Sequence, residues 1–374
     1  MCFPHYELHR DDGHVGVFHG KEDMIKCKIP DELVPDCACL LAGKQYVLLG
    51  GEDAKVQCIP LNDGALNVEA SAGLVLGMDD VSCMSSIPHS SPPSAVVGDD
   101  SGDLFLVTVT PAAGDAFSVE SLSSSELPLP HTSGLASLVV MSCEPGEAPM
   151  LVSASYDCAI QAQVLPGGDA AATSDSPAEA AWTAKVEALP PLDITDAAGR
   201  PLQSAGGVGS NPPFPHCAVE LPGRRVALGC GDGTVRILSA HDGRTLSICV
   251  GVHTAGVACM DTVAHAEGGF LLFTGGLDGR MAAWRIEDDL QEARVQEGQE
   301  DGAVDVLTSK DVAWVTRLPT DSTTERRWNA NAVCARCIPP QADSHKLQVS
   351  VAVAREAPEC AGHIVVYTLS VYNA

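Results

Sequence analysis

Residues 271–284 have the sequence LLFTGGLDGRMAAW, which is typical of two β-strands joined by a tight turn. The first half is an apolar run that ends in Thr274 and two glycines. An Asp-Gly pair begins at Asp278, and this pair is a strong hairpin signal because glycine accepts positive φ and aspartate bonds to turn backbone. Trp284 closes the second strand. The stretch therefore predicts a β-hairpin.

A histidine stands upstream of this hairpin, at His253, and an apolar strand follows it. The order of histidine, strand, strand ending in threonine, Asp-Gly turn and tryptophan resembles a blade of the WD40-repeat β-propeller family. The resemblance implies a buried hydrogen-bond chain of His253, Thr274, Asp278 and Trp284. Arg285 stands where the family usually has the Asp of its Trp-Asp pair. We expect the four residues to be structural rather than catalytic, because buried polar groups need partners.

Turn aspartates mark a repeat along the chain. They are Asp53, Asp100, Asp157, Asp232 and Asp278. Two of the intervals are close to the ~40–45 residues of a WD40 blade, and the longer ones contain insertions. The repeat pattern is weak in the first unit, near residues 6–29, and we expect an irregular seventh unit over 313–369. The sequence predicts an all-β, seven-bladed WD40 β-propeller of four-stranded antiparallel blades, as a single domain over residues 1–374.

Two stretches interrupt this rhythm. Residues 166–213 are rich in Ala, Gly, Ser and Pro, and we interpret them as an insertion between blades 4 and 5. Within them, Trp182 and Val186 are candidates for the outer strand of a blade. Residues 287–310 are acidic, and we interpret them as an insertion between blades 6 and 7.

The composition limits the partners. The 374 residues include 22 Lys and Arg against 49 Asp and Glu, a formal net charge of −27. Such a surface repels phosphate, so we expect neither nucleic acid nor an anionic membrane as a partner. No apolar run approaches the roughly 18 residues of a membrane span. Aromatic residues make up only 4%, so the blades must be filled mainly by Val, Leu, Ala and Cys.

The 15 cysteines indicate a compartment. Most lie in apolar contexts, and the chain opens with a mixed, polar segment rather than a signal peptide. We therefore expect reduced, buried thiols and a location in the cytoplasm, the nucleus or both.

No residue pattern requires a metal, a cofactor or a catalytic group. Cys334 and Cys337 have zinc-ligand spacing, but no second pair follows at a workable distance. Residues 207–211 are glycine-rich but follow no strand and open no helix, so they make a poor phosphate loop. A Gly-x-Ser-x-Gly elbow is absent. We expect no enzyme, although some WD40 propellers are esterases, and a propeller-fold hydrolase stays open as an alternative.

The resemblance implies a scaffold that binds other proteins or peptides through loops at the propeller rim. Basic residues are sparse, and four of them fall in loops: Arg224, Arg225, Arg326 and Arg327. They are either solvated loop charges or anchors for an acidic peptide.

A second reading is a substrate receptor that docks on the adaptor of a cullin-4-type ubiquitin ligase. Family members proposed for that role carry Trp-Asp-x-Arg at the end of a blade. This chain has WRIE at residues 284–287, and no other tryptophan is followed by aspartate. The scaffold is therefore the preferred prediction.

Overall fold

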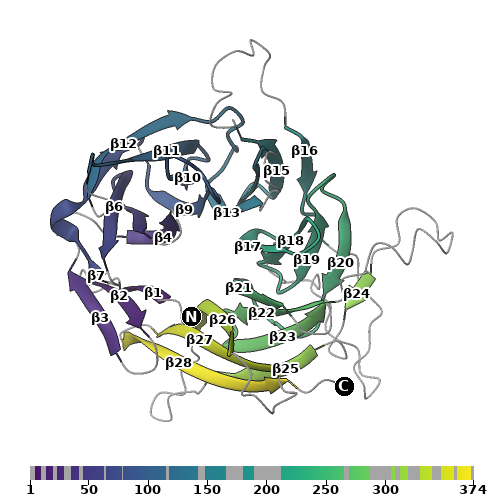
Figure 1. Ribbon diagram of the computed structural model, residues 1–374. Helices are drawn as coiled ribbons and strands as arrows, with labels where there is room; N and C mark the ends of the chain where they lie inside the picture. The colour runs from purple at the N-terminus through teal and green to yellow at the C-terminus, as the bar shows by residue number, and fades with distance from the viewer. Residues whose placement is uncertain are drawn as a thin grey trace, which may run out of the picture. The chain divides into compact units, whose positions relative to one another are not determined.

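The computed structural model shows a chain that folds into two compact units, residues 1–183 and 184–374 (Figure 1). The structure describes residues 5–9, 14–19, 23–28, 35–41, 45–62, 65–77, 79–114, 118–141, 148–165, 180–188, 212–264, 269–286, 305–307, 312–318, 329–338, 347–357 and 360–371. Within these ranges it contains 28 β-strands in seven sheets and one short 3-10 turn, η2 (Val68–Ala70). The prediction of an all-β protein is confirmed.

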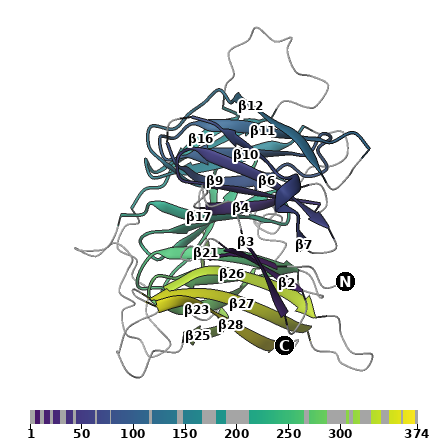
Figure 2. The same ribbon diagram turned by 90° about the vertical axis from the view of Figure 1, so that its left-hand side faces the viewer.

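The first unit contains four sheets, and their strands follow one another in the chain (Figure 2). The first sheet consists of β1 (His5–His9), β2 (His14–His19) and β3 (Asp23–Lys28). The second consists of β4 (Pro35–Leu41), β5 (Tyr46–Gly51), β6 (Lys55–Asn62), β7 (Ala65–Leu66) and β8 (Ala72–Val75). The third consists of β9 (Val81–Ser86), β10 (Ser94–Asp99), β11 (Leu104–Pro111) and β12 (Val119–Glu126). The fourth consists of β13 (Leu135–Met141), β14 (Met150–Ser155), β15 (Ala159–Val164) and β16 (Trp182–Lys185), which crosses the unit boundary.

The second unit contains three sheets. The fifth sheet consists of β17 (Pro215–Leu221), β18 (Arg225–Cys230), β19 (Val235–Ser239), β20 (Thr245–Cys249) and β24 (Asp305–Leu307). The sixth consists of β21 (Val257–Ala264), β22 (Phe270–Gly276), β23 (Arg280–Ile286) and β25 (Val312–Arg317). The seventh consists of β26 (Asn329–Ile338), β27 (Leu347–Ala357) and β28 (Cys360–Val371).

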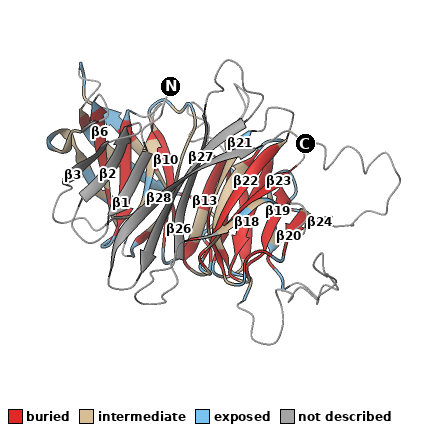
Figure 3. Ribbon diagram, turned by 90° about the horizontal axis from the view of Figure 1, so that it is seen from below, coloured by how far each residue is buried: buried red, intermediate tan, exposed pale blue. Residues whose placement is uncertain are grey.

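The second strands of four sheets are buried on both faces and mostly apolar. Every residue of β5, β10, β18 and β22 is buried. Figure 3 shows β18, β19, β22 and β23 almost entirely in the colour of buried residues. Continuous apolar runs of this kind are what a strand needs when side chains cover its sheet from both sides.

A β-bulge recurs in the first strand of five sheets. In each, one residue of the first strand is skipped near the end of the second strand. The residue after the bulge is Cys37, Cys83, Ser137, Cys217 or Cys259, and it faces Gly50, Gly98, Ala154, Gly229 or Gly275. The residue opposite the bulge is therefore glycine or alanine in all five sheets.

The glycines allow neighbouring sheets to approach each other. A Cβ atom added at Gly50 would lie 2.5 Å from Val81 Cγ1, and one at Gly229 would lie 2.9 Å from Val257 Cγ1. Val81 and Val257 are the first residues of the following sheets, and both are fully buried. Each glycine therefore makes room for the first strand of the next sheet in its own unit.

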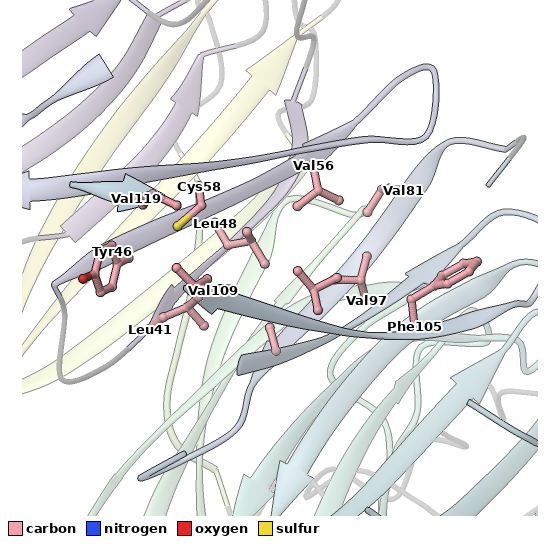
Figure 4. Packing of buried hydrophobic residues seen from close by; sticks show 12 residues of the cluster. Leu41, Tyr46, Leu48, Val56, Cys58, Val81, Val97, Phe105, Val109 and Val119 are labelled. Carbon is pink, nitrogen blue, oxygen red and sulfur yellow. The ribbon is translucent and has the colours of Figure 1, made fainter. Parts of the chain in front are cut away.

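Aliphatic side chains and cysteines fill the spaces between sheets, as the low aromatic content predicts. In the first unit, Leu48 and Cys58 of the second sheet pack with Val97 and Phe105 of the third (Figure 4). In the second unit, a similar cluster includes Trp284. The cores are thus built from many small side chains.

Three strands differ from the sequence prediction or refine it. The segment 313–316 was expected in the seventh unit, but β25 pairs with β23 and is the outer strand of the sixth sheet. Trp182 lies in β16, the outer strand of the fourth sheet, as predicted, and Val186 next to it is buried. β24 lies within the acidic stretch and pairs in parallel with β20 of the fifth sheet. The interpretation of residues 1–374 as one domain with insertions at 166–213 and 287–310 stays a prediction.

Candidate interaction surface

A chain of buried hydrogen bonds crosses the sixth sheet. The Trp284 indole N–H donates to Thr274 Oγ1 at 3.2 Å, and Thr274 Oγ1 lies 2.8 Å from His253 Nε2. His253 Nδ1 lies 3.4 Å from Asp278 Oδ1. The structure thus brings together all four residues that the sequence analysis grouped.

The donors and acceptors of this chain fit one arrangement. A carboxylate only accepts, so Nδ1 of His253 carries the proton toward Asp278. With the single ring proton on Nδ1, Nε2 accepts, so the Thr274 hydroxyl donates to it while accepting from Trp284. Every polar atom of the chain has a partner, which is the arrangement that a buried network requires.

Asp278 anchors the loop before the sheet to the turn inside it. Its Oδ2 accepts from the Thr254 N–H at 2.8 Å, and its Oδ1 accepts from the Arg280 N–H at 3.0 Å. Burial alone would raise the pKa of Asp278, but hydrogen bonds from His253, Thr254 and Arg280 hold that pKa well below its usual range. The carboxylate is therefore ionised and fixed at neutral pH.

A second network, which the sequence analysis did not single out, lies in the fourth sheet. His131 Nε2 lies 2.8 Å from Ser153 Oγ, and His131 Nδ1 lies 3.6 Å from Asp157 Oδ2. Asp157 also accepts from the Thr132 N–H at 3.1 Å. Burial lowers the pKa of His131, so its imidazole is neutral at pH 7. Spacing is the signal that would have found it: Ser153 precedes Asp157 by four residues, as Thr274 precedes Asp278.

The fourth sheet lacks the tryptophan of the sixth. Gln163 pairs with Leu151 just as Trp284 pairs with Leu272, so Gln163 occupies the equivalent position. Gln163 is buried, and its Nε2 has no hydrogen-bond partner among the described residues. A buried donor without an acceptor is destabilising.

The Ser153, His131 and Asp157 contacts have the connectivity of a catalytic triad. Ser153 is fully buried, however, so its hydroxyl cannot reach a substrate carbonyl. The same holds for Thr274 in the sixth sheet. Both networks hold turns in place rather than presenting a nucleophile.

The other turn aspartates lie in different surroundings. Asp232 accepts from the Thr234 N–H and hydroxyl, and Arg236 lies 3.8 Å from it. Asp53 has φ of 59° and pairs with Lys55 at 3.2 Å. Asp100 is exposed, one position ahead of Ser101, which is the residue that corresponds to Asp278 in the sheet register.

Neighbouring carboxylates affect Asp100. Burial, together with Asp80 and Asp99, raises the pKa of Asp100 above its usual value. Its neighbour Asp99 forms the turn instead, accepting from the N–H groups of Gly102 at 3.0 Å and Asp103 at 2.8 Å. The third sheet therefore carries an acidic turn without a histidine partner in the described residues.

The arginines predicted as partner anchors do not gather at one place. Arg224 is exposed, with φ of 55°, in the loop between β17 and β18. Arg225 is only 3% exposed, donates from Nε to the Pro222 carbonyl at 2.7 Å and stacks 5.1 Å from the Phe270 ring centroid. Arg225 is thus an interior residue rather than a surface anchor, because its aliphatic stem and guanidinium are both used for packing. Arg326 and Arg327 lie outside the described residues.

Exposed apolar residues lie in the turns at one end of the fourth and sixth sheets. We use "entry edge" for the end of a sheet, across all its strands, at which the first strand begins and the second strand turns into the third. Tyr156 is 42% exposed at this edge of the fourth sheet, and Leu277 is 38% exposed at this edge of the sixth. The Tyr156 N–H donates to the Gly134 carbonyl at 3.1 Å, and the Leu277 N–H donates to the Gly256 carbonyl at 2.8 Å. Both residues precede the turn aspartate directly, so equivalent positions present them.

The described residues contain no cluster of three or more His, Cys, Asp or Glu arranged to hold a metal ion. Cys334 and Cys337 both lie in β26, and their side chains are outside the described part of the structure. No helix in the described part is long and apolar enough to cross a membrane.

Comparisons with known proteins identify the fold. No family model and no curated protein matches the sequence. Among solved structures, one match has a TM-score of 0.54 at 14% sequence identity and covers 94% of this chain and 85% of the other. The fold is that of a WD40 β-propeller, with each sheet as one blade. The matching structure is the crystal structure of the WD40 β-propeller domain of Doa1. The predicted fold class is confirmed.

Proposed function

We propose that the chain is a non-enzymatic scaffold that binds other proteins or peptides at the entry edges of its blades. One observation carries this proposal. In blades 4 and 6, buried hydrogen-bond networks fix the turns, and a large apolar side chain, Tyr156 or Leu277, projects directly beside each network.

Fixed turns favour binding for a physical reason. A loop that is already ordered loses less conformational entropy when a partner binds. Large apolar or aromatic side chains are the usual anchors of protein interfaces. The hydrophobic turn residues and the networks behind them therefore act as parts of one binding surface in each blade.

The test is affinity capture of the tagged protein from its own cells, followed by a salt wash and quantitative mass spectrometry. We expect a reproducible set of bound proteins that the double variant Tyr156→Ser, Leu277→Ser loses. The control is the double variant Val164→Ser, Val315→Ser, which removes residues 60% and 57% exposed, one at the end of β15 and one in the outer strand β25. A wild-type protein that retains nothing, or equal loss in both variants, contradicts the proposal.

We propose a ubiquitin-ligase adaptor as a second, more specific class of partner. Two short segments, 230–237 in blade 5 and the turn at 98–102, resemble blade segments of WD repeat-containing protein 53. That similarity supports, as a second candidate, a substrate receptor on a cullin-4-type ligase adaptor. Recovery of the cullin and its adaptor in the capture would support the receptor, and their absence would leave the general scaffold.

We propose the cytoplasm or the nucleus as the location. Nine cysteines of the described residues have free thiols, and five of these cysteines are buried. Free thiols of this kind persist in reducing compartments. Microscopy of the tagged chain tests this, and an exclusively extracellular signal would contradict it.

A further inference from the structure

Arg280 is a positioned cation at the entry edge of blade 6. Its Nη1 donates to the Val252 carbonyl, and its Nε lies 3.6 Å from Asp278 Oδ2. Its side chain is 25% exposed, and no described residue contacts its Nη2 through a hydrogen bond or an ion pair. Two anchored nitrogens fix the guanidinium plane, so one N–H fork remains for a ligand.

Two large, partly exposed apolar side chains lie at the entry edges of blades 5 and 6. Leu277 lies three residues before Arg280 in the same turn and is 38% exposed. Phe214, at the entry edge of blade 5, is 37% exposed, and its carbonyl accepts from the Gly231 N–H at 2.7 Å. Gly231 packs closely on Gly256, since a Cβ atom added at Gly256 would lie 3.2 Å from Gly231 Cα. The Gly256 carbonyl in turn accepts from the Leu277 N–H. A continuous strip of backbone thus connects Phe214 with Leu277 and Arg280.

The charge of this part of the chain differs from the rest. Residues 212–286 contain six arginines and six acidic residues, a net charge of zero. Residues 35–165 contain two lysines and 16 acidic residues, a net charge of −14. Blades 5 and 6 are therefore a neutral region in an acidic protein.

No exposed carboxylate competes for Arg280 at this edge. In the described residues of 212–286, the one exposed acidic residue is Asp242. It follows β19, whereas the entry-edge turn precedes β19, so Asp242 lies at the opposite edge of blade 5. An incoming carboxylate thus meets Arg280 without facing an exposed carboxylate from these residues.

We propose that the entry edge of blades 5 and 6 binds an extended peptide that presents a carboxylate next to a large apolar side chain. This proposal rests on the scaffold function and names its ligand class. The carboxylate accepts from Arg280 Nη2, and the apolar side chain packs on Leu277 or Phe214. Selectivity comes from the guanidinium, because a charge-assisted bond is about twice as strong as a neutral one.

The test measures fluorescence polarisation of the full chain with three labelled peptide pools. Each pool has a Leu followed by a fixed Glu, Gln or Lys, with random residues on both sides. We expect the Glu pool to bind wild type roughly tenfold or more tightly than the Gln pool. Arg280→Gln should abolish this difference, whereas Arg285→Gln, an exposed arginine of the same strand, should keep it.

The thermal midpoint of Arg280→Gln shows whether this variant is folded. A second variant tests the site independently of Arg280. Leu277→Ser removes a side chain that is 38% exposed and should weaken binding of the Glu and Gln pools alike. No binding of the Glu pool to wild type, equal binding of the Glu and Gln pools, or equal effects of the Arg280 and Arg285 variants overturns the proposal. If Arg280→Gln captures the same proteins from cells as the wild type does, the scaffold function stands and this ligand class is refuted.

Discussion

Replacing Thr274 by valine tests the hydrogen-bond network of blade 6. Valine has nearly the volume of threonine, so no cavity forms at this fully buried position. The change removes the oxygen that both His253 Nε2 and Trp284 Nε1 contact, at 2.8 and 3.2 Å. Each buried group left without a partner costs about 1–3 kcal/mol, so the free energy of unfolding should fall by about 2–6 kcal/mol.

Urea denaturation monitored by tryptophan fluorescence measures this change. The control is Thr245→Val, a half-buried threonine of β20 outside both networks. It should change stability by less than about 0.5 kcal/mol. Ser153→Ala in blade 4 should give a smaller loss than Thr274→Val, since among the described residues His131 is the one side chain that Ser153 contacts by a hydrogen bond, and the other contact of Ser153 is a long one of 3.5 Å to the Gln161 carbonyl. A Thr274→Val protein as stable as the Thr245→Val protein would refute the network's structural role.

Three further predictions follow from buried or crowded groups. Gln163→Leu should raise the free energy of unfolding by about 1 kcal/mol, because it removes a buried amide N–H without a partner; a loss measured by the same urea titration would contradict this. Asp100→Asn should raise the thermal midpoint at pH 7, because the raised pKa means that the folded state disfavours the carboxylate. This gain should vanish below about pH 4, where the carboxyl is protonated in both states, and a gain that persists at pH 3 would contradict the reasoning. Burial raises the pKa of Cys58 and Cys83 to about 12, so roughly one thiol in ten thousand is ionised at pH 8; alkylation mapped by mass spectrometry should spare both in the native protein and label both in urea.

Local signals made much of this structure predictable. The Asp-Gly turn at Asp278 and its spacing from His253 and Trp284 gave the hairpin and the four residues of its network. Blade 4 has the same spacing, with Ser153 in place of Thr274 and Gln163 in place of Trp284, and it contains a similar network. A motif search that requires tryptophan misses it, although the contacts of His131 with Ser153 and Asp157 remain.

Long-range pairing was not predictable from local pattern. The apolar alternation of β25 fits an outer strand of blade 6 as well as a first strand of the next unit. Only pairing with β23 decides between them. β24 has three residues and joins blade 5 in parallel, so it has too little pattern of its own. Arg225 was expected on the surface because it lies next to a loop, but its stacking partner, Phe270, is 45 residues away in the chain.

Hydrogen–deuterium exchange on the protein bound to a captured partner tests the central claim most directly. Exchange is compared in the free protein and in the complex, at the level of short peptides. Protection by the partner should appear at the turns around Tyr156 and Leu277, with the outer strands β12, β16 and β25 unchanged. Protection confined to those outer strands, with both turns exchanging as in the free protein, would contradict binding at the entry edges.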